Sequence, residues 1–110
     1  MTKYGNIPCV WKGIAFRSKA ERDHALFLEG EKQARRIEDW VYERKFPLYA
    51  WSHEKGRIQV CVHIPDFLVF KKDRLEVHEV KGVKTAAWSL KKKLFCANYP
   101  LYGYKVISAK

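Results

Sequence analysis

The sequence predicts a mixed α and β fold, because two stretches with helical spacing of apolar residues stand among several stretches rich in β-forming residues. The chain has 110 residues, of which 47% are hydrophobic and 15% aromatic. This composition is typical of a globular chain, and the length suits one domain with one core. We therefore expect residues 1–110 to form a single domain.

Two short elements are expected before the first helix. Residues Met1–Asn6 are predicted to be a loose basic arm. The triplets Cys9–Trp11 and Ile14–Phe16 flank the dipeptide Lys12-Gly13, which predicts a small hairpin with a two-residue turn.

The first helix is predicted from about Lys19 to near Ala34. Ser18 and Glu21 fit the capping box S-x-x-E, in which both side chains satisfy backbone N–H groups at the helix start. His24 lies one turn after Glu21 and is expected to be a partly buried helix residue rather than a metal ligand.

The middle of the chain is predicted to be extended. Ile37–Trp51 is rich in aromatic residues, which either stack on bases or fill a core or a dimer face. Pro47 indicates an edge position or a bulge, because proline cannot donate a ladder hydrogen bond. Arg57–Ile64 alternates as a strand does, and it is expected to continue through a bend at Pro65 into the next strand. One face of this strand carries Ile58, Val60, Val62 and Ile64, and the other carries Gln59, Cys61 and His63.

The second helix is predicted over about Ala86–Tyr99, because Pro100 ends it. Its apolar face is expected to carry Ala87, Leu90, Leu94 and Ala97, with Trp88 and Phe95 beside it. Tyr102–Ser108 is predicted to be a final strand.

A second hairpin is predicted between these helices, and it contains the candidate catalytic residues. Its arms are Asp66–Phe70 and Leu75–Lys81, and the polar residues between them indicate a tight turn. If the turn centres on residues 72 and 73, Asp66 lies directly opposite Glu79. Side chains alternate along a strand, so Lys81 emerges on the same face as Glu79.

Two carboxylates in this position repel each other. Cross-strand Cβ atoms lie about 5 Å apart, and two bare carboxylates at that separation repel by roughly 3 kcal/mol at an effective dielectric of about 20. Either one carboxylate stays protonated or a cation lies between them. Lys81 offsets the charge in part. Oxygen ligands from Asp66, Glu79 and the Val80 carbonyl favour Mg²⁺ or Mn²⁺, which predicts metal-assisted hydrolysis of a phosphodiester.

These residues resemble the signature of the PD-(D/E)XK nuclease superfamily. Pro65-Asp66 is followed after twelve residues by Glu79-Val80-Lys81. Four further segments make the chain similar to a small phage and prophage branch of that superfamily, which resembles Holliday-junction resolvases; they are Lys3–Asn6, Gly13–Glu21, Lys81–Thr85 and Leu90–Phe95. The resemblance implies an α/β fold in which a mixed central sheet is flanked by helices, as in restriction endonucleases.

The resemblance also implies roles for individual residues. Asp66 and Glu79 would bind metal, with Lys81 acting on the attacking water or on developing charge. Glu21 has two open interpretations, a helix cap for Ser18 or a further catalytic carboxylate of the metal site. His63 is expected to be a neutral strand residue or a neighbour of the metal ligands, and so is His78, because histidine suits zinc better than magnesium.

A basic surplus points to an anionic partner. The formal net charge is +10, which is typical of proteins that bind nucleic acid. The cations expected to surround the site and to contact phosphate are Lys71, Lys72, Arg74, Lys84, Lys91, Lys92 and Lys93. Three consecutive lysines on a helix spread around its axis, so Lys91–Lys93 cannot all reach one ligand. The alternative is that these cations are simply solvated.

The expected function is a Mg²⁺- or Mn²⁺-dependent DNA endonuclease acting on branched or duplex DNA, with junction resolution and a homodimer inferred by analogy. Two alternatives stay open. One is a nuclease subunit of a phage recombination, transposition or packaging complex, and the other is a non-catalytic nucleic-acid-binding protein. No apolar run approaches membrane-spanning length, so we expect a cytoplasmic protein without membrane contact.

Overall fold

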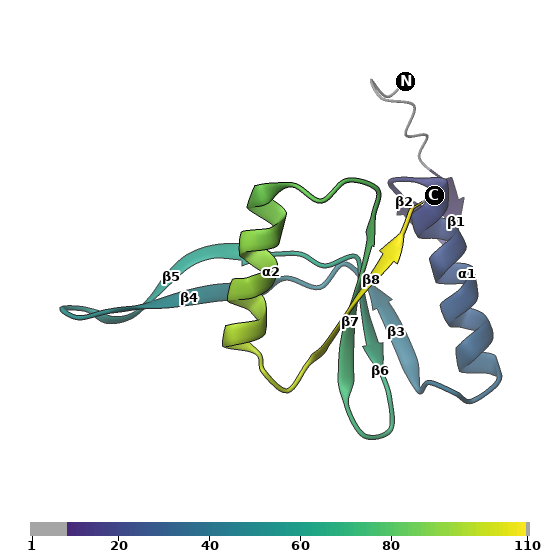
Figure 1. Cartoon of the computed structure of the whole chain (residues 1–110). Helices are drawn as coiled ribbons and strands as arrows, with labels where there is room; N and C mark the ends of the chain where they lie inside the picture. Colours follow the sequence, from purple (N-terminus) through teal and green to yellow (C-terminus); the bar gives the residue numbers. More distant parts are fainter. Residues whose placement is uncertain (1–8, 110) are drawn as a thin grey trace.

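The computed structural model describes residues 9–109, so the predicted arm at Met1–Asn6 lies outside the described residues. Its helices and strands are shown in Figure 1. In chain order they are β1 (Cys9–Trp11), β2 (Ile14–Phe16), α1 (Lys19–Gln33), β3 (Asp39–Tyr42), β4 (Phe46–Ser52), β5 (Gly56–His63), β6 (Phe67–Phe70), β7 (Leu75–Lys81), α2 (Ala86–Asn98) and β8 (Gly103–Ser108).

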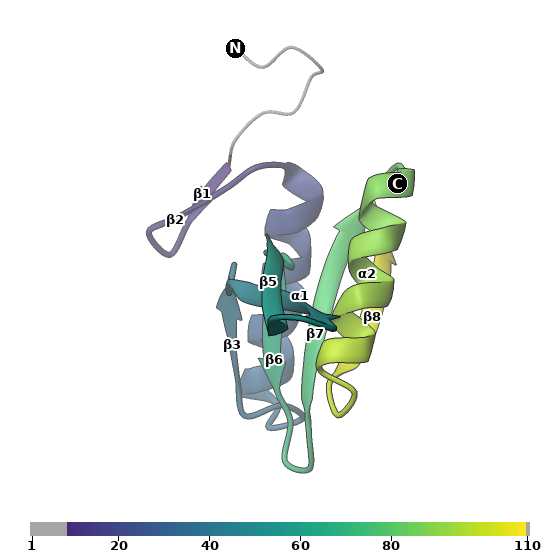
Figure 2. The ribbon, with the colours of Figure 1, turned by 90° about the vertical axis from the view of Figure 1, so that its left-hand side faces the viewer.

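A four-stranded sheet in the order β3-β6-β7-β8 forms the centre of the fold (Figure 2). Strands β7 and β8 are parallel and the other pairs are antiparallel, which makes the sheet mixed. One hydrophobic cluster joins α1 to Phe67 and Val69, and a second joins α2 to Leu68 and Val77. Successive residues of one strand point to opposite faces, so the two helices cover opposite faces. The predicted mixed sheet flanked by helices is confirmed.

The register of the β6–β7 hairpin agrees with the pairing that its alternating residues predict. Phe67 pairs with His78, which sets the preceding Asp66 beside Glu79 at the open end. At the closed end the Lys71 N–H donates to the Arg74 carbonyl at 2.9 Å. The alternation of β-forming residues is enough to specify this pairing, because the two arms are joined by a tight local turn.

The extended middle of the chain divides between two sheets. The predicted stretch Ile37–Trp51 is broken at residues 43–45, where Glu43 takes a left-handed backbone with φ of 58°. Strand β3 joins the central sheet, whereas β4 and β5 form a separate two-stranded sheet. The expectation that β5 and β6 form one long bent strand is therefore wrong, because the chain changes sheet around the fully buried Pro65. We call the β4–β5 hairpin the arm, and it projects from the body in Figure 1.

Helix α2 packs through a different face from the one predicted. Its buried residues are Trp88 and Phe95, and Leu90 is 68% exposed. The two large aromatic side chains lie two turns apart and fill the space over the sheet better than the smaller residues would. In the part of the chain that the structure describes, no helix has both the length and the apolar character needed to cross a membrane.

Candidate functional site

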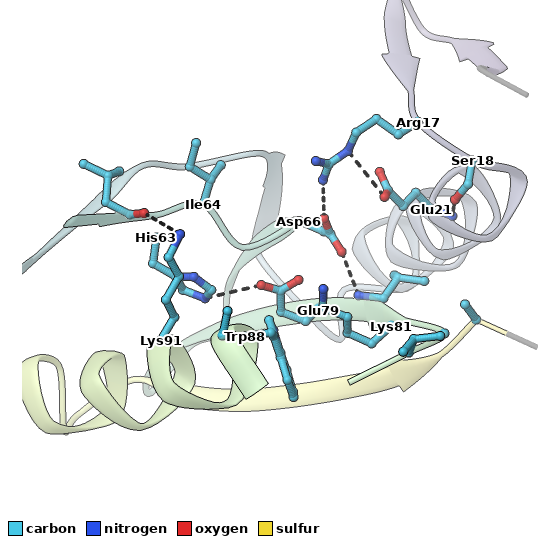
Figure 3. Close-up of a pocket in the computed structure, with 16 residues that line it drawn as sticks. Arg17, Ser18, Glu21, His63, Ile64, Asp66, Glu79, Lys81, Trp88 and Lys91 are labelled. Carbon is cyan, nitrogen blue, oxygen red and sulfur yellow. Dashed lines mark hydrogen bonds and ion pairs between the residues drawn. The ribbon is translucent and has the colours of Figure 1, made fainter. Parts of the chain in front are cut away.

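A cleft of about 750 Å³ opens where the β6–β7 hairpin is open (Figure 3). Its walls come from elements far apart in the sequence. They are the N-terminal turn of α1 with Glu21 and the preceding Arg17, the end of β5 with Val62 and the following Ile64, the end of β7 with Glu79 and Lys81, and α2 with Trp88 and Lys91. The predicted carboxylates Asp66, Glu79 and Glu21 all line this cleft.

Asp66 lies at the bottom of the cleft and is only 3% exposed. Its Oδ2 accepts a hydrogen bond from the Val80 backbone N–H at 2.7 Å, and its Oδ1 accepts one from Arg17 Nη2 at 2.6 Å. Burial, followed by repulsion from Glu21 and Glu79, raises the pKa of Asp66 to about 7. Burial and the two neighbouring carboxylates therefore disfavour the ionised form of Asp66 more than its two hydrogen-bond donors favour it.

Arg17 forms ion pairs with carboxylates of this site. Its guanidinium reaches Asp66 at 2.6 Å, Glu43 at 3.3 Å and Glu21 at 3.5 Å. Neither Arg17 nor Glu43 is among the site residues that the sequence predicts. Arg17 directly precedes the Ser18 helix cap and lies in the segment Gly13–Glu21 that supports the resemblance, but neither fact pairs it with Asp66. Glu43 is brought to the site by the break in the chain after β3.

The structure separates the two proposed roles of Glu21. Ser18 Oγ accepts a hydrogen bond from the Glu21 backbone N–H at 3.2 Å, so the serine caps α1. The Glu21 carboxylate instead accepts a hydrogen bond from the Tyr42 hydroxyl and pairs with Arg17. Its side chain is therefore directed to the cleft rather than to the helix end.

Glu79 is held from the other side of the cleft. His63 Nε2 lies 3.3 Å from Glu79 Oε1, and the Tyr104 hydroxyl lies 3.4 Å from the same oxygen. His63 Nε2 and the Tyr104 hydroxyl oxygen are also 2.9 Å apart. Burial, followed by repulsion from Glu79, raises the pKa of Tyr104 well above its usual range. The hydroxyl thus remains a hydrogen-bond donor at any physiological pH.

His78, the second histidine near the motif, faces away from the cleft. Its Nδ1 lies 2.9 Å from His24 Nε2, and its Nε2 lies 3.0 Å from Glu76 Oε1. The two histidines are therefore buried members of a hydrogen-bonded chain between α1 and β7. Burial lowers the pKa of both, which keeps both rings neutral near pH 7.

The Val80 carbonyl is directed to the carboxylates. The Lys81 carbonyl accepts a hydrogen bond from the Ala109 N–H at 3.1 Å and so points to β8. Consecutive carbonyls of a strand point to opposite sides, so the Val80 carbonyl points to the side of Asp66. Lys81 lines the cleft with its Nζ 5.5 Å from the centre of the Trp88 indole ring.

Whether this site suits a divalent cation follows from its donors. Within residues 9–109, no three His, Cys, Asp or Glu side chains are grouped so that they could hold a metal ion. Nevertheless, Asp66, Glu79 and the Val80 carbonyl offer only oxygen donors, and burial together with repulsion from Glu21 and Glu79 raises the pKa of Asp66. These donors fit a hard cation such as Mg²⁺ or Mn²⁺ once Arg17 has moved from the Asp66 carboxylate.

The predicted basic cluster divides into three groups. Lys91 lines the cleft, and Lys84, Lys92 and Lys93 line a separate hollow beside α2. The third group, Lys71, Lys72 and Arg74, lies at the closed end of the hairpin, about 15 Å from Asp66 at roughly 3.3 Å per residue. The expectation that this third group surrounds the carboxylates is wrong. Glu76 pairs with Lys71 at 3.2 Å and with Arg74 at 2.7 Å.

Fold and site together define a small α/β domain in which three carboxylates and three basic side chains line one cleft. Over residues 1–109 the chain matches the model of the family described as "Protein of unknown function (DUF1064)", and it belongs to that family. No curated protein and no solved structure matches the chain.

Proposed function

We propose that this chain is a metal-dependent DNA endonuclease with a site of the PD-(D/E)XK type. The register of β6 and β7 carries the proposal, because it brings Asp66 to Glu79 with Lys81 on the same face of the cleft. A buried carboxylate with a pKa near 7 costs stability, so its retention at the bottom of an open cleft supports a role in chemistry. The net charge of +10 supports an anionic polymer as substrate.

Each residue has a distinct task in this proposal. Asp66, Glu79 and the Val80 carbonyl would hold Mg²⁺ or Mn²⁺, which when bound lowers the pKa of water and offsets charge on the phosphate. Lys81 would turn from Trp88 to orient the attacking water or to donate to a phosphate oxygen, since its four-carbon stem is flexible. Lys91 would contact the phosphate backbone at the cleft wall.

The substrate is expected to be duplex or branched DNA. The described residues form one small domain around the cleft, so recognition of DNA shape by this domain is favoured over recognition of bases. Resolution of four-way junctions is the leading specific role, by analogy with enzymes that the motif resembles. Such an enzyme would act in the host cytoplasm during phage recombination or packaging.

The test is cleavage of a labelled panel of DNA substrates: a four-way junction, a fork, a flap, a linear duplex and a single strand. Each is incubated with Mg²⁺, Mn²⁺ or EDTA, using wild type, Lys81→Ala and the control Lys72→Ala, which alters a lysine at the distant turn. We expect metal-dependent cutting that is lost in Lys81→Ala and kept in Lys72→Ala. Tight binding without any cutting, unchanged in Asp66→Ala, would instead indicate a non-catalytic nucleic-acid-binding protein.

One observation favours a second candidate, a nuclease subunit that is inactive alone. Arg17 Nη2 occupies the Asp66 oxygen that a metal ion would need, at 2.6 Å. A partner protein or bound DNA would then have to draw Arg17 away. In that case the isolated chain cuts poorly, Arg17→Gln restores cutting, and a second phage protein does the same for wild type.

A further inference from the structure

A β-bulge divides the arm into a half next to the body and a distal half. Leu48 pairs with Cys61, but its neighbour Tyr49 pairs with Gln59, so Val60 is the extra residue of β5. Such a residue turns the side chains beyond it to the opposite face of the hairpin. The unbroken alternation predicted for β5 is therefore wrong.

The bulge gathers aromatic and polar side chains on one face of the distal half. Tyr49 and Trp51 alternate along β4, and their register partners are Gln59 and Arg57. We call these four residues the distal face. Trp51 is 78% exposed, and both residues of β5 are exposed as well. Arg57 Cζ lies 4.2 Å from the centre of the Tyr49 ring, within the range of a cation–π contact.

The distal face is continuous with a wall of the cleft. Pro47 lies two residues before Tyr49 and so on the same face of the hairpin, and its register partner Val62 lines the cleft. The opposite face packs on the body, because Phe46 and Leu48 belong to the hydrophobic cluster under α2. A polymer that occupies the cleft and continues along the arm would therefore meet the distal face.

Helix α2 holds the arm where the distal half begins. The Tyr49 N–H donates to Asn98 Oδ1 at 2.8 Å, and Asn98 Nδ2 donates to the Tyr49 carbonyl at 3.1 Å. Beyond these two bonds the hairpin projects from the body (Figure 1). The aromatic residues of the middle stretch thus have different roles, since Trp40 and Phe46 are buried in the core whereas Trp51 faces solvent.

The chemistry of the distal face identifies its occupant. A single exposed apolar side chain is common on protein surfaces. Here the Trp51 indole shares its face with a guanidinium and an amide, and within the described residues Arg57 has no carboxylate partner. Aromatic rings stack on nucleobases, and a guanidinium binds phosphate. The net charge of +10 also favours an anionic polymer over a protein as the occupant.

Stacking requires a base whose face is open. Inside a duplex both faces of a base are covered by its neighbours, whereas at a branch or in a single strand they are accessible. The inference rests on the proposed function, which makes DNA the occupant of the cleft. We propose that Trp51 stacks on an unpaired base of branched DNA, while Arg57, stacked on Tyr49, contacts the adjoining phosphate. The arm thereby supplies the recognition of DNA shape.

The length of the arm sets which base is contacted. Arg57, the register partner of Trp51, is separated from the cleft residue Ile64 by roughly 20 Å along β5. The rise along each strand of duplex DNA is about 3.4 Å per nucleotide. The base on Trp51 should therefore lie about six steps from the phosphate that is cut.

The test is fluorescence anisotropy of the full chain in EDTA, where binding is measured without cutting. A labelled fork with two single-stranded tails is compared with a linear duplex of the same length. Trp51→Ala should weaken binding to the fork about tenfold and hardly change binding to the duplex. Trp51→Phe keeps an aromatic ring and should restore most of the affinity for the fork, whereas Trp51→Leu should not. The control is Leu101→Ala, at a side chain outside the arm that is 90% exposed, and it should bind both DNAs like wild type.

Arg57→Gln gives a second measurement that leaves the indole in place. It should lower the slope of log affinity for the fork against log salt by about one, and an unchanged slope would exclude Arg57 as a phosphate contact. The stacking proposal is overturned by an unchanged fork affinity in Trp51→Ala, by an equal loss on fork and duplex, or by full rescue in Trp51→Leu. A wild type that binds the fork through Trp51 but cuts no DNA would contradict the proposed nuclease and support the stacking. Cutting that coincides with fork binding independent of Trp51 would do the reverse.

Discussion

Replacing Asp66 by asparagine should stabilise the metal-free protein. The Asp66 carboxyl is buried beside Glu21 and Glu79, and its pKa is raised from 3.8 to about 7. The stability associated with a group whose pKa is raised by folding is fully present below pH 3.8 and is lost as the pH rises through about 7. At pH 8 the ionised carboxylate therefore lowers the free energy of unfolding. A neutral amide of similar shape removes this destabilisation.

The magnitude follows from the size of the shift. A shift of about three pKa units at about 1.4 kcal/mol each limits the gain at pH 8 to about 4 kcal/mol. Asparagine keeps an acceptor for the Val80 N–H but loses the charge on which Arg17 is anchored. The Arg17 side chain is 60% exposed, so water compensates most of this loss. We expect a net increase of about 2 kcal/mol in the free energy of unfolding.

The assay is urea unfolding in EDTA at pH 8 and at pH 4, for wild type and Asp66→Asn. The variant should be more stable at pH 8, with a difference that shrinks towards zero at pH 4. Adding Mg²⁺ or Mn²⁺ at pH 8 should raise the unfolding midpoint of wild type and leave that of the variant almost unchanged. A variant less stable than wild type at pH 8 in EDTA would refute the charge surplus, and equal metal effects would refute the assignment of Asp66 as a ligand.

Three further changes test neighbouring parts of the site. Arg17→Gln removes the guanidinium that competes for Asp66, so Mn²⁺ should bind severalfold more tightly in calorimetry, and weaker binding would contradict the competition. Lys91→Ala should lower the slope of log affinity for DNA against log salt by about one, measured by anisotropy in EDTA, whereas Lys72→Ala at the distant turn should hardly change it. Burial, then His78, lowers the pKa of His24 from 6.5 to about 4, so stability is lost as the pH falls across that window. In His24→Gln the loss between pH 6.5 and pH 4 should be smaller in urea unfolding, and an unchanged loss would exclude His24 as its source.

Features that depend on local sequence could be predicted. The β6–β7 register depends on a tight turn and on alternating residues within sixteen positions, and these local features are sufficient to place Asp66 beside Glu79. The bounds of α1 follow from the Ser18 cap, and those of α2 from Pro100 beyond its end. Cap and turn chemistry act over three or four residues, so a single sequence contains all the information needed.

Features that depend on distant partners could not be predicted. Nothing local shows that β4 and β5 leave the central sheet, because an alternating strand fits a sheet of any size. The role of Arg17 could not be predicted for the same reason, because its partner Asp66 is 49 positions away in the sequence. The cations of the β6–β7 turn were also expected at the wrong place, because they are near Glu79 in the sequence but at the other end of the hairpin in space.

Strand β5 connects the arm with the proposed nuclease site, because the residue at its end reaches a carboxylate of the cleft. His63 Nε2 lies 3.3 Å from Glu79 Oε1. A two-stranded hairpin is marginally stable by itself, so movements of the arm would be transmitted to Glu79 through His63. They should displace Glu79 more than Asp66, because Asp66 is held independently by Arg17 and by the Val80 N–H.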